Sequence, residues 1–288
     1  MSEAGKADNA DGKAYRVLAR KYRPASFSDL IGQEPMVRTL TNAFAANRIA
    51  QAWMLTGVRG VGKTTTARIL ARALNYKTPD IDRPSIDLAE PGEHCKAIME
   101  GRHVDVIEMD AASHTGIDDI REIIEQVRYA PVAARYKVYI IDEVHMLSTQ
   151  AFNGLLKTLE EPPPHVKFIF ATTEIRKVPI TVLSRCQRFD LRRVDAGLLV
   201  EHLRGIAGKE DVAVEDEALA MIATVPWPWV PMVRAQLAIA ATDSQISTWR
   251  RSNLSASQPT GNCATAPPST KVARNQAVWL AFRPTSWP

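Results

Sequence analysis

The 288-residue sequence is poor in cysteine and has no long apolar segment, and each absence argues against a class of protein. Its 3 cysteines are scattered, so they predict no disulfide framework and favour a reducing, cytoplasmic location. No apolar run reaches the roughly 18 residues of a membrane-spanning helix. Residues 1–14 are polar, which argues against a signal peptide and predicts a disordered tail. We expect no membrane partner for the chain. An apolar share of 45% still provides a core for one large domain, alone or with a smaller one.

The excess of positive charge is confined to the last part of the chain. A formal net charge of +4 would by itself indicate a nucleic-acid partner. Residues 224–288, however, hold six basic residues and one acidic residue, whereas residues 1–223 hold 30 basic and 31 acidic residues. The same segment contains five of the six tryptophans and eight of the 18 prolines. The composition therefore changes near Thr224, and the basic charge says little about the rest.

Before that boundary, short apolar runs alternate with segments of helical spacing. Strands are predicted at 52–56, 104–109, 137–141, 166–171 and 187–191, and helices at 63–74 and 150–160. This alternation predicts a three-layer α/β domain with a parallel sheet over residues 15–193. From residue 194 only helical spacing remains, which predicts part of a helical domain at 194–223.

A glycine-rich segment lies between the first predicted strand and the helix after it. Residues 57–64 match the phosphate-loop pattern G-x-x-x-x-G-K-[ST], in which backbone N–H groups surround a β-phosphate. Lys63 would reach the β- and γ-phosphate oxygens, the Thr64 hydroxyl would bind Mg²⁺, and Arg59 would face solvent or a partner. The predicted nucleotide contacts are Gly57, Val58, Arg59, Gly60, Val61, Gly62, Lys63 and Thr64.

Two adjacent carboxylates follow the buried strand at 137–141. Ligands of open α/β sheets bind at the carboxyl ends of the strands. Asp142 would hold Mg²⁺, and Glu143 would act as the general base that polarises the attacking water. His145, two residues further on, has either a structural or a chemical role.

Two further polar positions follow later strands. Thr172 and Thr173 end the strand at 166–171, so their hydroxyls would lie near the γ-phosphate, although threonine also favours strands in general. Arg185 precedes the last strand. It is either an ordinary surface residue or a group that reaches the ATP of a neighbouring subunit.

Taken together, these motifs resemble those of AAA+ ATPases of the clamp-loader clade. The chain is more narrowly similar to the family of bacterial DNA polymerase III gamma/tau subunits, from about residue 15 to residue 223. Four segments carry that likeness, at 17–24 (VLARKYRP), 31–34 (IGQE), 110–113 (DAAS) and 159–163 (LEEPP). The resemblance implies a P-loop AAA+ three-layer fold followed by a truncated α-helical lid.

The resemblance also implies an activity. In that family, ATP and Mg²⁺ drive the loading of a sliding clamp onto primed DNA during replication. Thr173 occupies the position that senses the γ-phosphate, and Arg185 the arginine finger that acts on an adjacent subunit. The implied partners are the other clamp-loader subunits of a hetero-pentamer, the clamp, primed DNA and the DNA polymerase III core. The family is classified with DNA-directed DNA polymerase, a nucleotidyltransferase, but this sequence contains no polymerase site.

The chain departs from the family in two places. Many relatives carry a four-cysteine zinc module, but Tyr76, Ala89 and Gly92 stand where three of the cysteines would be. Only Cys95 matches, with His94 beside it, so we expect no zinc site. The family's G-S-x-R-D motif is also missing after residue 223, and three prolines between residues 226 and 231 are incompatible with a helix there. Arg234 is a poor substitute for its arginine.

The sequence change at residue 224 leads us to hypothesise a shift of reading frame, with 224–288 as an irregular tail foreign to the family. Translation of the coding sequence in the other two frames would test this hypothesis. Two alternative functions remain. One is a nucleotide-binding replication fragment without turnover, and the other is a different AAA+ DNA motor such as a branch-migration helicase.

Overall fold

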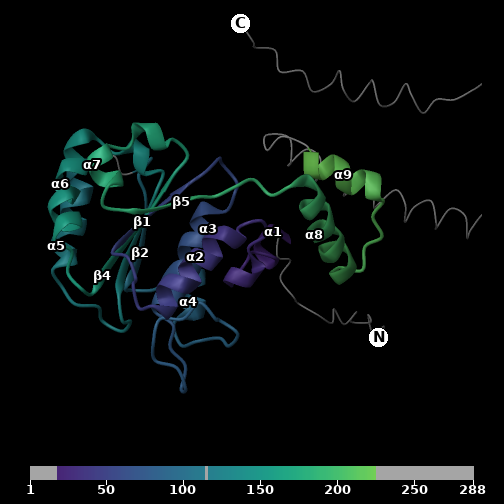
Figure 1. Cartoon of the computed structure of the whole chain (residues 1–288), viewed down its shortest axis with the longest axis horizontal. Helices are drawn as coiled ribbons and strands as arrows, with labels where there is room; N and C mark the ends of the chain where they lie inside the picture. The colour runs from purple at the N-terminus through teal and green to yellow at the C-terminus, as the bar shows by residue number, and fades with distance from the viewer. Residues whose placement is uncertain (1–17, 114–115, 225–288) are drawn as a thin grey trace, which may run out of the picture. The chain divides into compact units, whose positions relative to one another are not determined.

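The computed structural model describes residues 18–113 and 116–224, all of which lie within one compact unit, Met1–Trp227. Five parallel strands form a single sheet in the order β2-β3-β4-β1-β5 (Figure 1). The strands are β1 (Ala52–Thr56), β2 (Val106–Asp110), β3 (Lys137–Asp142), β4 (Val166–Thr172) and β5 (Gln187–Asp190). The predicted parallel sheet is therefore confirmed.

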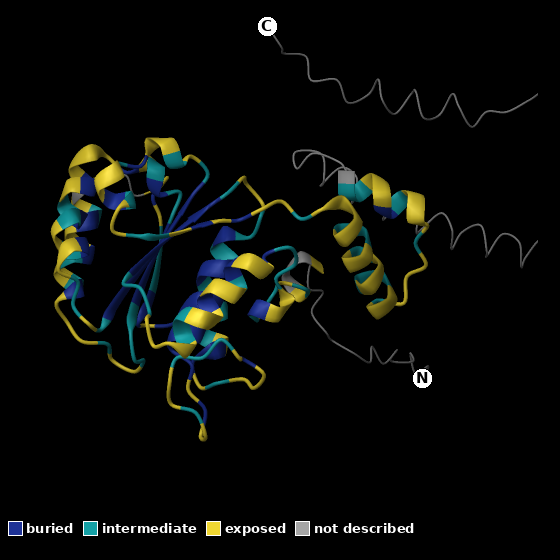
Figure 2. Ribbon diagram, in the orientation of Figure 1, coloured by how far each residue is buried: buried dark blue, intermediate teal, exposed yellow. Residues whose placement is uncertain are grey.

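Burial explains which strands the sequence predicts well. Every residue of β1 and β4 is buried, because these strands lie inside the sheet and helices cover both of its faces (Figure 2). β2 and β5 form the two edges and are only partly buried. The predicted strand at 104–109 is wrong at its start, since β2 begins at Val106 and Val104 is 60% exposed. The strand predicted to end at residue 191 ends at Asp190.

Helices cover the two faces of the sheet. Alternate β1 side chains point to opposite faces, so Trp53 joins one apolar cluster and Met54 the other. The first cluster contains residues of α2 (Glu34–Ala45), α3 (Lys63–Leu74) and α4 (Cys95–Met99). The second contains residues of α5 (Ile117–Val127), α6 (Thr149–Glu160) and α7 (Ile180–Leu183). The three-layer α/β architecture is thus confirmed.

The ends of the predicted helices have clear local causes. α6 begins after Ser148, whose hydroxyl accepts the N–H of Ala151, and it ends before Pro162. α3 matches the predicted helix at 63–74 residue for residue. The short helix α1 (Leu18–Lys21) precedes them all in the described part of the chain.

Two helices follow the sheet, α8 (Ala196–Lys209) and α9 (Asp216–Thr224). No residue of α8 is buried (Figure 2), whereas Leu219 of α9 is buried. The expected domain boundary near residue 194 remains a prediction. The expected irregular tail also remains a prediction, because residues 225–288, with Arg234, lie outside the described residues. The same holds for the N-terminal segment at 1–14. Among the described residues, no helix is long and apolar enough to cross a membrane.

The strand order places three loops next to one another. β4 lies between β1 and β3, and all three run in the same direction. Thr56 at the end of β1 pairs with Thr172 at the end of β4. The segment after β1, the threonines after β4 and Asp142 at the end of β3 therefore emerge at the same edge of the sheet.

Candidate nucleotide-binding site

The loop between β1 and α3 needs its glycines for different reasons. Gly62 has φ +92°, a left-handed conformation that strains any residue with a Cβ atom. A Cβ at Gly57, where φ is +149°, would lie 2.8 Å from the carbonyl oxygen of Leu191. The loop conformation thus follows from the sequence motif, and it presents the amino end of α3 to the space beside it.

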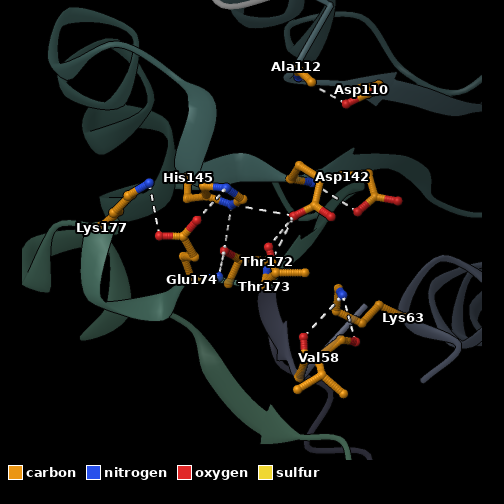
Figure 3. Close-up of polar contacts among 12 residues, drawn as sticks. Val58, Lys63, Asp110, Ala112, Asp142, His145, Thr172, Thr173, Glu174 and Lys177 are labelled. Atoms are coloured by element: carbon orange, nitrogen blue, oxygen red, sulfur yellow. Dashed lines mark hydrogen bonds and ion pairs between the residues drawn. The ribbon is translucent and has the colours of Figure 1, made fainter. Parts of the chain in front are cut away.

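Lys63 lies under this loop and is 6% exposed. Its ammonium Nζ donates to the carbonyl oxygens of Gly57 at 3.1 Å and Val58 at 3.3 Å (Figure 3). Burial lowers the pKa of Lys63 below its usual range, while the carboxylates of Glu143 and Asp142 act in the opposite direction. These two carboxylates face the ammonium without sharing a hydrogen bond with it among the described contacts, so its charge is available to phosphate oxygens.

Thr64 and Asp142 are in direct contact. The Thr64 hydroxyl donates to Oδ2 of Asp142 at 2.5 Å, and Oδ1 of the same carboxylate accepts the N–H of Glu143 at 2.9 Å. A hydroxyl and a carboxylate side by side offer the oxygen ligands that Mg²⁺ prefers. The residues present therefore fit a magnesium ion bound through one or two protein ligands.

Glu143 is held by the end of β4. Its Oε2 accepts the hydroxyl of Thr173 at 2.9 Å and the backbone N–H of Thr173 at 3.2 Å (Figure 3). The backbone of Glu143 is left-handed, with φ +45° and ψ +43°, which costs of order 1–3 kcal/mol outside glycine. The structure brings these two predicted residues together, with the Thr173 hydroxyl directed at a carboxylate.

Thr172 and His145 form a neighbouring pair. Thr172 is fully buried, and its Oγ1 lies 3.0 Å from Nδ1 of His145. Thr172 is therefore turned away from the phosphate loop, contrary to the expectation that both threonine hydroxyls lie near a γ-phosphate. The physical reason is the alternation of side chains along a strand, which sends neighbouring residues to opposite faces.

Arg185 lies apart from the other predicted residues. Its guanidinium donates to Oε1 of Glu160 and to the carbonyl oxygen of Thr181, each at 2.5 Å. It is not among the residues that line the cavity beside the phosphate loop. In this chain the structure therefore does not join Arg185 to the group formed by Lys63 and Glu143.

A cavity of about 860 Å³ opens beside the phosphate loop, lined by residues 59–65 and by Asp142 and Glu143. Arg59 is exposed at its rim, as expected for a residue that faces solvent or a partner. The other walls include residues that the sequence analysis did not assign to the site, such as Tyr22, Pro24, Ile31, Gln33, Leu199 and His202.

Gln33 explains how these distant segments meet. Its side-chain Nε2 donates to the carbonyl oxygen of Arg192 at 2.7 Å, and its Oε1 accepts the Arg192 N–H at 3.2 Å. A second link joins Glu210 after α8 to Lys21 and Tyr22, at 2.6 and 2.5 Å. Gln33 belongs to the IGQE segment that the sequence analysis noted, but its hydrogen bonds to Arg192 depend on the fold.

The positions of the missing zinc ligands converge without forming a metal cluster. A Cβ at Gly92 would lie 3.2 Å from Sγ of Cys95 and 3.3 Å from the ring of Tyr76. The buried guanidinium of Arg72 donates to Cys95 Sγ at 2.9 Å and to three backbone carbonyls. Residues 18–113 and 116–224 contain no group of three metal-binding side chains, and the absence of zinc stays a prediction.

Solved structures with a similar architecture define the fold class. The RuvB Holliday junction branch migration motor of Thermotoga maritima superposes with a TM-score of 0.54. The match covers 76% of this chain and 67% of that one at 21% sequence identity, and it shows the fold alone. The chain has the α/β fold of AAA+ P-loop ATPases, as predicted.

Sequence relatives narrow the class to a family. The family model described as DNA polymerase III, delta subunit, matches residues 32–195, so the chain belongs to this family of DNA polymerase III subunits. It is 45% identical over 237 residues to DNA polymerase III subunit tau of Escherichia coli, covering 82% of this chain and 36% of the relative. It is 48% identical over 211 residues to subunit tau of Bacillus subtilis, covering 73% of this chain and 37% of the relative. The resemblance to gamma/tau subunits is confirmed, and the chain spans about a third of these relatives' length.

Proposed function

We propose that the chain is an ATP-dependent clamp-loader subunit of a bacterial DNA polymerase III. It would use ATP binding and hydrolysis to load a sliding clamp on primed DNA. The observation that carries the proposal is the meeting of three groups at one edge of the sheet, namely the phosphate loop, Asp142 with Glu143, and Thr173. Phosphoryl transfer needs little from a protein beyond such positioning and electrostatic stabilisation.

In this proposal the triphosphate lies along the phosphate loop. Lys63 exchanges its two carbonyl partners for phosphate oxygens, since those carbonyls belong to the loop itself. Thr64 and Asp142 hold Mg²⁺, which supplies positive charge beside the phosphates. Tyr22, Ile31 and Leu199, which also line the cavity, would provide an apolar wall for the adenine of ATP.

Hydrolysis would depend on Glu143. A carboxylate at the edge of the cavity is suited to orient and deprotonate a water molecule. Thr173 is not among the residues that line the cavity, but it donates its hydroxyl to Glu143 and would respond to the γ-phosphate through that carboxylate. The two residues therefore couple the presence of a γ-phosphate to the position of the base.

Arg185 would act on the ATP of an adjacent subunit. Its present partner is Glu160, with both side chains partly exposed, and exposed pairs contribute only about 0–1 kcal/mol. Such a contact is readily given up on assembly. The proposed partners are the other subunits of a hetero-pentameric loader, the sliding clamp, primed DNA and the polymerase core.

Two observations favour this function over a branch-migration motor. The relatives that are 45–48% identical are DNA polymerase III subunits. The likeness to the Thermotoga RuvB motor is 21% identical and carries the fold alone. An ATPase assay with primed DNA and a sliding clamp distinguishes them, because a clamp-loader subunit is stimulated by the clamp and a branch-migration motor is not.

The arginine finger permits a sharp test of assembly. Chains carrying Lys63→Ala or Arg185→Ala should each lose most ATPase activity, by about 10³-fold for the arginine. Mixed together, they should recover a measurable part, because the arginine of the Lys63→Ala chain completes the site of the other. A mixture no more active than its components, or a wild-type rate per chain independent of concentration, would contradict action in trans.

The same ATPase assay also tests the alternative that the chain binds nucleotide without hydrolysing it. A chain that binds ATP at one site per molecule but releases no phosphate, even with the clamp, primed DNA and partner subunits, would be a nucleotide-binding fragment. We expect turnover, because Glu143, Thr173 and Lys63 are all present and in contact with the groups described above.

A further inference from the structure

His145 is a buried histidine whose environment is polar rather than apolar. Its side chain is 6% exposed, and it lies in the short 3-10 turn Val144–Met146 that follows Glu143. Val144 before it and Leu147 two residues after it belong to an apolar cluster, whereas Met146 is 45% exposed. The imidazole is instead directed at polar groups.

The imidazole lies between the end of β4 and two carboxylates (Figure 3). Its Nδ1 is 3.0 Å from the hydroxyl of Thr172 and 3.4 Å from Oε2 of Glu143. Its Nε2 is 3.7 Å from Oε1 of Glu174, whose other carboxylate oxygen meets Lys177 at 2.9 Å. Both ring nitrogens thus face polar groups.

Thr172 and Glu143 both lie against Nδ1 of His145. Oγ1 of Thr172 accepts the backbone N–H of Glu174 at 3.0 Å and lies 3.0 Å from Nδ1. A hydroxyl oxygen can accept a second hydrogen bond, and the Glu143 carboxylate beside Nδ1 only accepts, so both groups can share an Nδ1–H. These contacts orient the ring beside the Glu143 carboxylate.

The two oxygens of Glu143 have different surroundings. Oε2 contacts the Thr173 N–H, the Thr173 hydroxyl and the edge of the His145 ring. Oε1 has no hydrogen-bond partner among the described residues, and Glu143 lines the cavity. One oxygen is therefore anchored and the other is available to a water molecule.

We infer that His145 is a positioning residue for Glu143. Its imidazole, held by Thr172, closes the side of the Glu143 carboxylate away from the cavity and keeps Oε1 directed at the reacting water. The inference rests on the proposed function, because it assigns a helper to the proposed base. His145 does not line the cavity, so it contributes to the rate of hydrolysis and not to nucleotide binding.

Two substitutions separate this role from simple packing. His145→Leu keeps an apolar volume in the turn but removes both nitrogens, and it should lower kcat about 10- to 100-fold. His145→Asn is smaller, but its amide can replace Nδ1 beside Thr172, so it should recover most of the rate. The KM for ATP should change less than about twofold in both. A packing role predicts the opposite order, with Leu tolerated and Asn damaging.

A double-mutant cycle tests the contact with Thr172. Thr172→Val should lower kcat to a similar extent, and combining it with His145→Leu should add little, because both changes break the same link. Tyr139→Phe is the matched control. Tyr139 is a buried residue of β3 whose hydroxyl has no partner among the described residues, and its change should leave kcat unaltered.

The assay uses the full chain with its partner subunits, and it measures ATP binding and single-turnover hydrolysis separately. A wild-type chain that binds ATP without hydrolysing it would overturn the proposed function, and this inference with it. A wild-type chain that hydrolyses ATP, together with a His145→Leu chain of equal kcat, would overturn the inference alone. Thermal unfolding of each variant identifies any that fails to fold, in which case the Asn variant and the Thr172→Val variant decide.

Discussion

Two buried lysines at opposite ends of the sheet have nearly the same local chemistry. Lys63 at the carboxyl end rests on two backbone carbonyl oxygens, and Lys167 at the amino end rests on the carbonyl oxygen of Ala50 and Oε1 of Gln51. Burial lowers the pKa of both, to about 8 for Lys167. Lys63 lines the large cavity, however, and Lys167 does not.

Acidic residues at the two ends of the sheet differ in the same way, with only the one at the carboxyl end beside the cavity. Asp105 at the amino end accepts three backbone N–H groups, from Val132, Ala133 and Ala134, at 2.7–2.8 Å. Asp142 at the carboxyl end is bound mainly through the hydroxyl of Thr64. The three N–H groups around Asp105 occupy its carboxylate away from the cavity, whereas Asp142 lines the cavity, where phosphate or metal can replace the Thr64 hydroxyl. Buried polar groups with exchangeable partners beside a cavity therefore mark the ligand site.

The largest effect that we expect is a loss of ATP hydrolysis on substitution at the carboxyl end of the sheet. Glu143→Gln should lower the rate of ATP hydrolysis by about 10²–10⁴-fold, because an amide cannot accept the proton of the attacking water. ATP affinity and the free energy of unfolding should change little, since the amide oxygen can still accept from Thr173. Phosphate release and nucleotide binding, measured on the same preparation, check this. An equal loss of binding and rate would place Glu143 in nucleotide binding.

At the amino end, substitution should affect stability and leave chemistry intact. Asp105→Ala should lower the free energy of unfolding by about 2–4 kcal/mol, because three backbone donors lose their acceptor. Denaturant unfolding measures the loss, and Asp105→Asn, which retains one oxygen, should lose less. ATP hydrolysis per folded molecule should be unchanged, and a specific loss of rate would break the distinction between the two ends.

Asp105 should also contribute to acid sensitivity. Burial by itself raises the pKa of this carboxyl, but the three backbone N–H groups outweigh it and lower the pKa below its usual range. Its stabilising contribution is therefore fully present above the unfolded pKa near 4 and is lost as the pH falls through the folded pKa. The Asp105→Asn variant should show a flatter acid unfolding curve than the wild type.

The smallest effect is a pH dependence at Lys167. Between a folded pKa of about 8 and an unfolded pKa near 10.5, the unfolded chain binds more protons, so stability rises with pH. Relative to Lys167→Met, which lacks this group, the wild type should gain about 1–3 kcal/mol across that window. Urea unfolding at pH 7.5 and pH 10 measures the difference. A constant difference would mean that the lysine keeps its charge in the folded state.

The parts of the fold that the sequence predicted are those that the sheet buries on both sides. β1, β3 and β4 appear as apolar runs, whereas the edge strand β2 is only partly buried and its start was misplaced at Val104. We did not predict α5 from the sequence. Its buried Ile120, Ile123 and Val127 do have helical spacing, although the helix also carries four acidic residues.

The residues of the candidate site likewise fall into those that the sequence reveals and those that only the fold reveals. The phosphate loop and the Asp142–Glu143 pair are contiguous motifs, so the sequence reveals them and strand order brings them together. Gln33, Leu199 and His202 reach the cavity through contacts between segments more than 150 residues apart, such as the Gln33–Arg192 hydrogen bonds. No periodicity or motif in a single sequence encodes such a pairing. Likewise, the contact of His145 with Thr172 depends on the register of β3 and β4.

The central claim is that the carboxyl end of the sheet is a magnesium-nucleotide site and the amino end is not. Calorimetric titration of ATP into the wild type, Lys63→Met and Lys167→Met tests it most directly, because the two substitutions remove matched buried lysines. The account predicts about one ATP bound per wild-type chain only when Mg²⁺ is present, loss of binding in Lys63→Met, and unchanged binding in Lys167→Met. Binding that survives in Lys63→Met, or is lost equally in both variants, would contradict it.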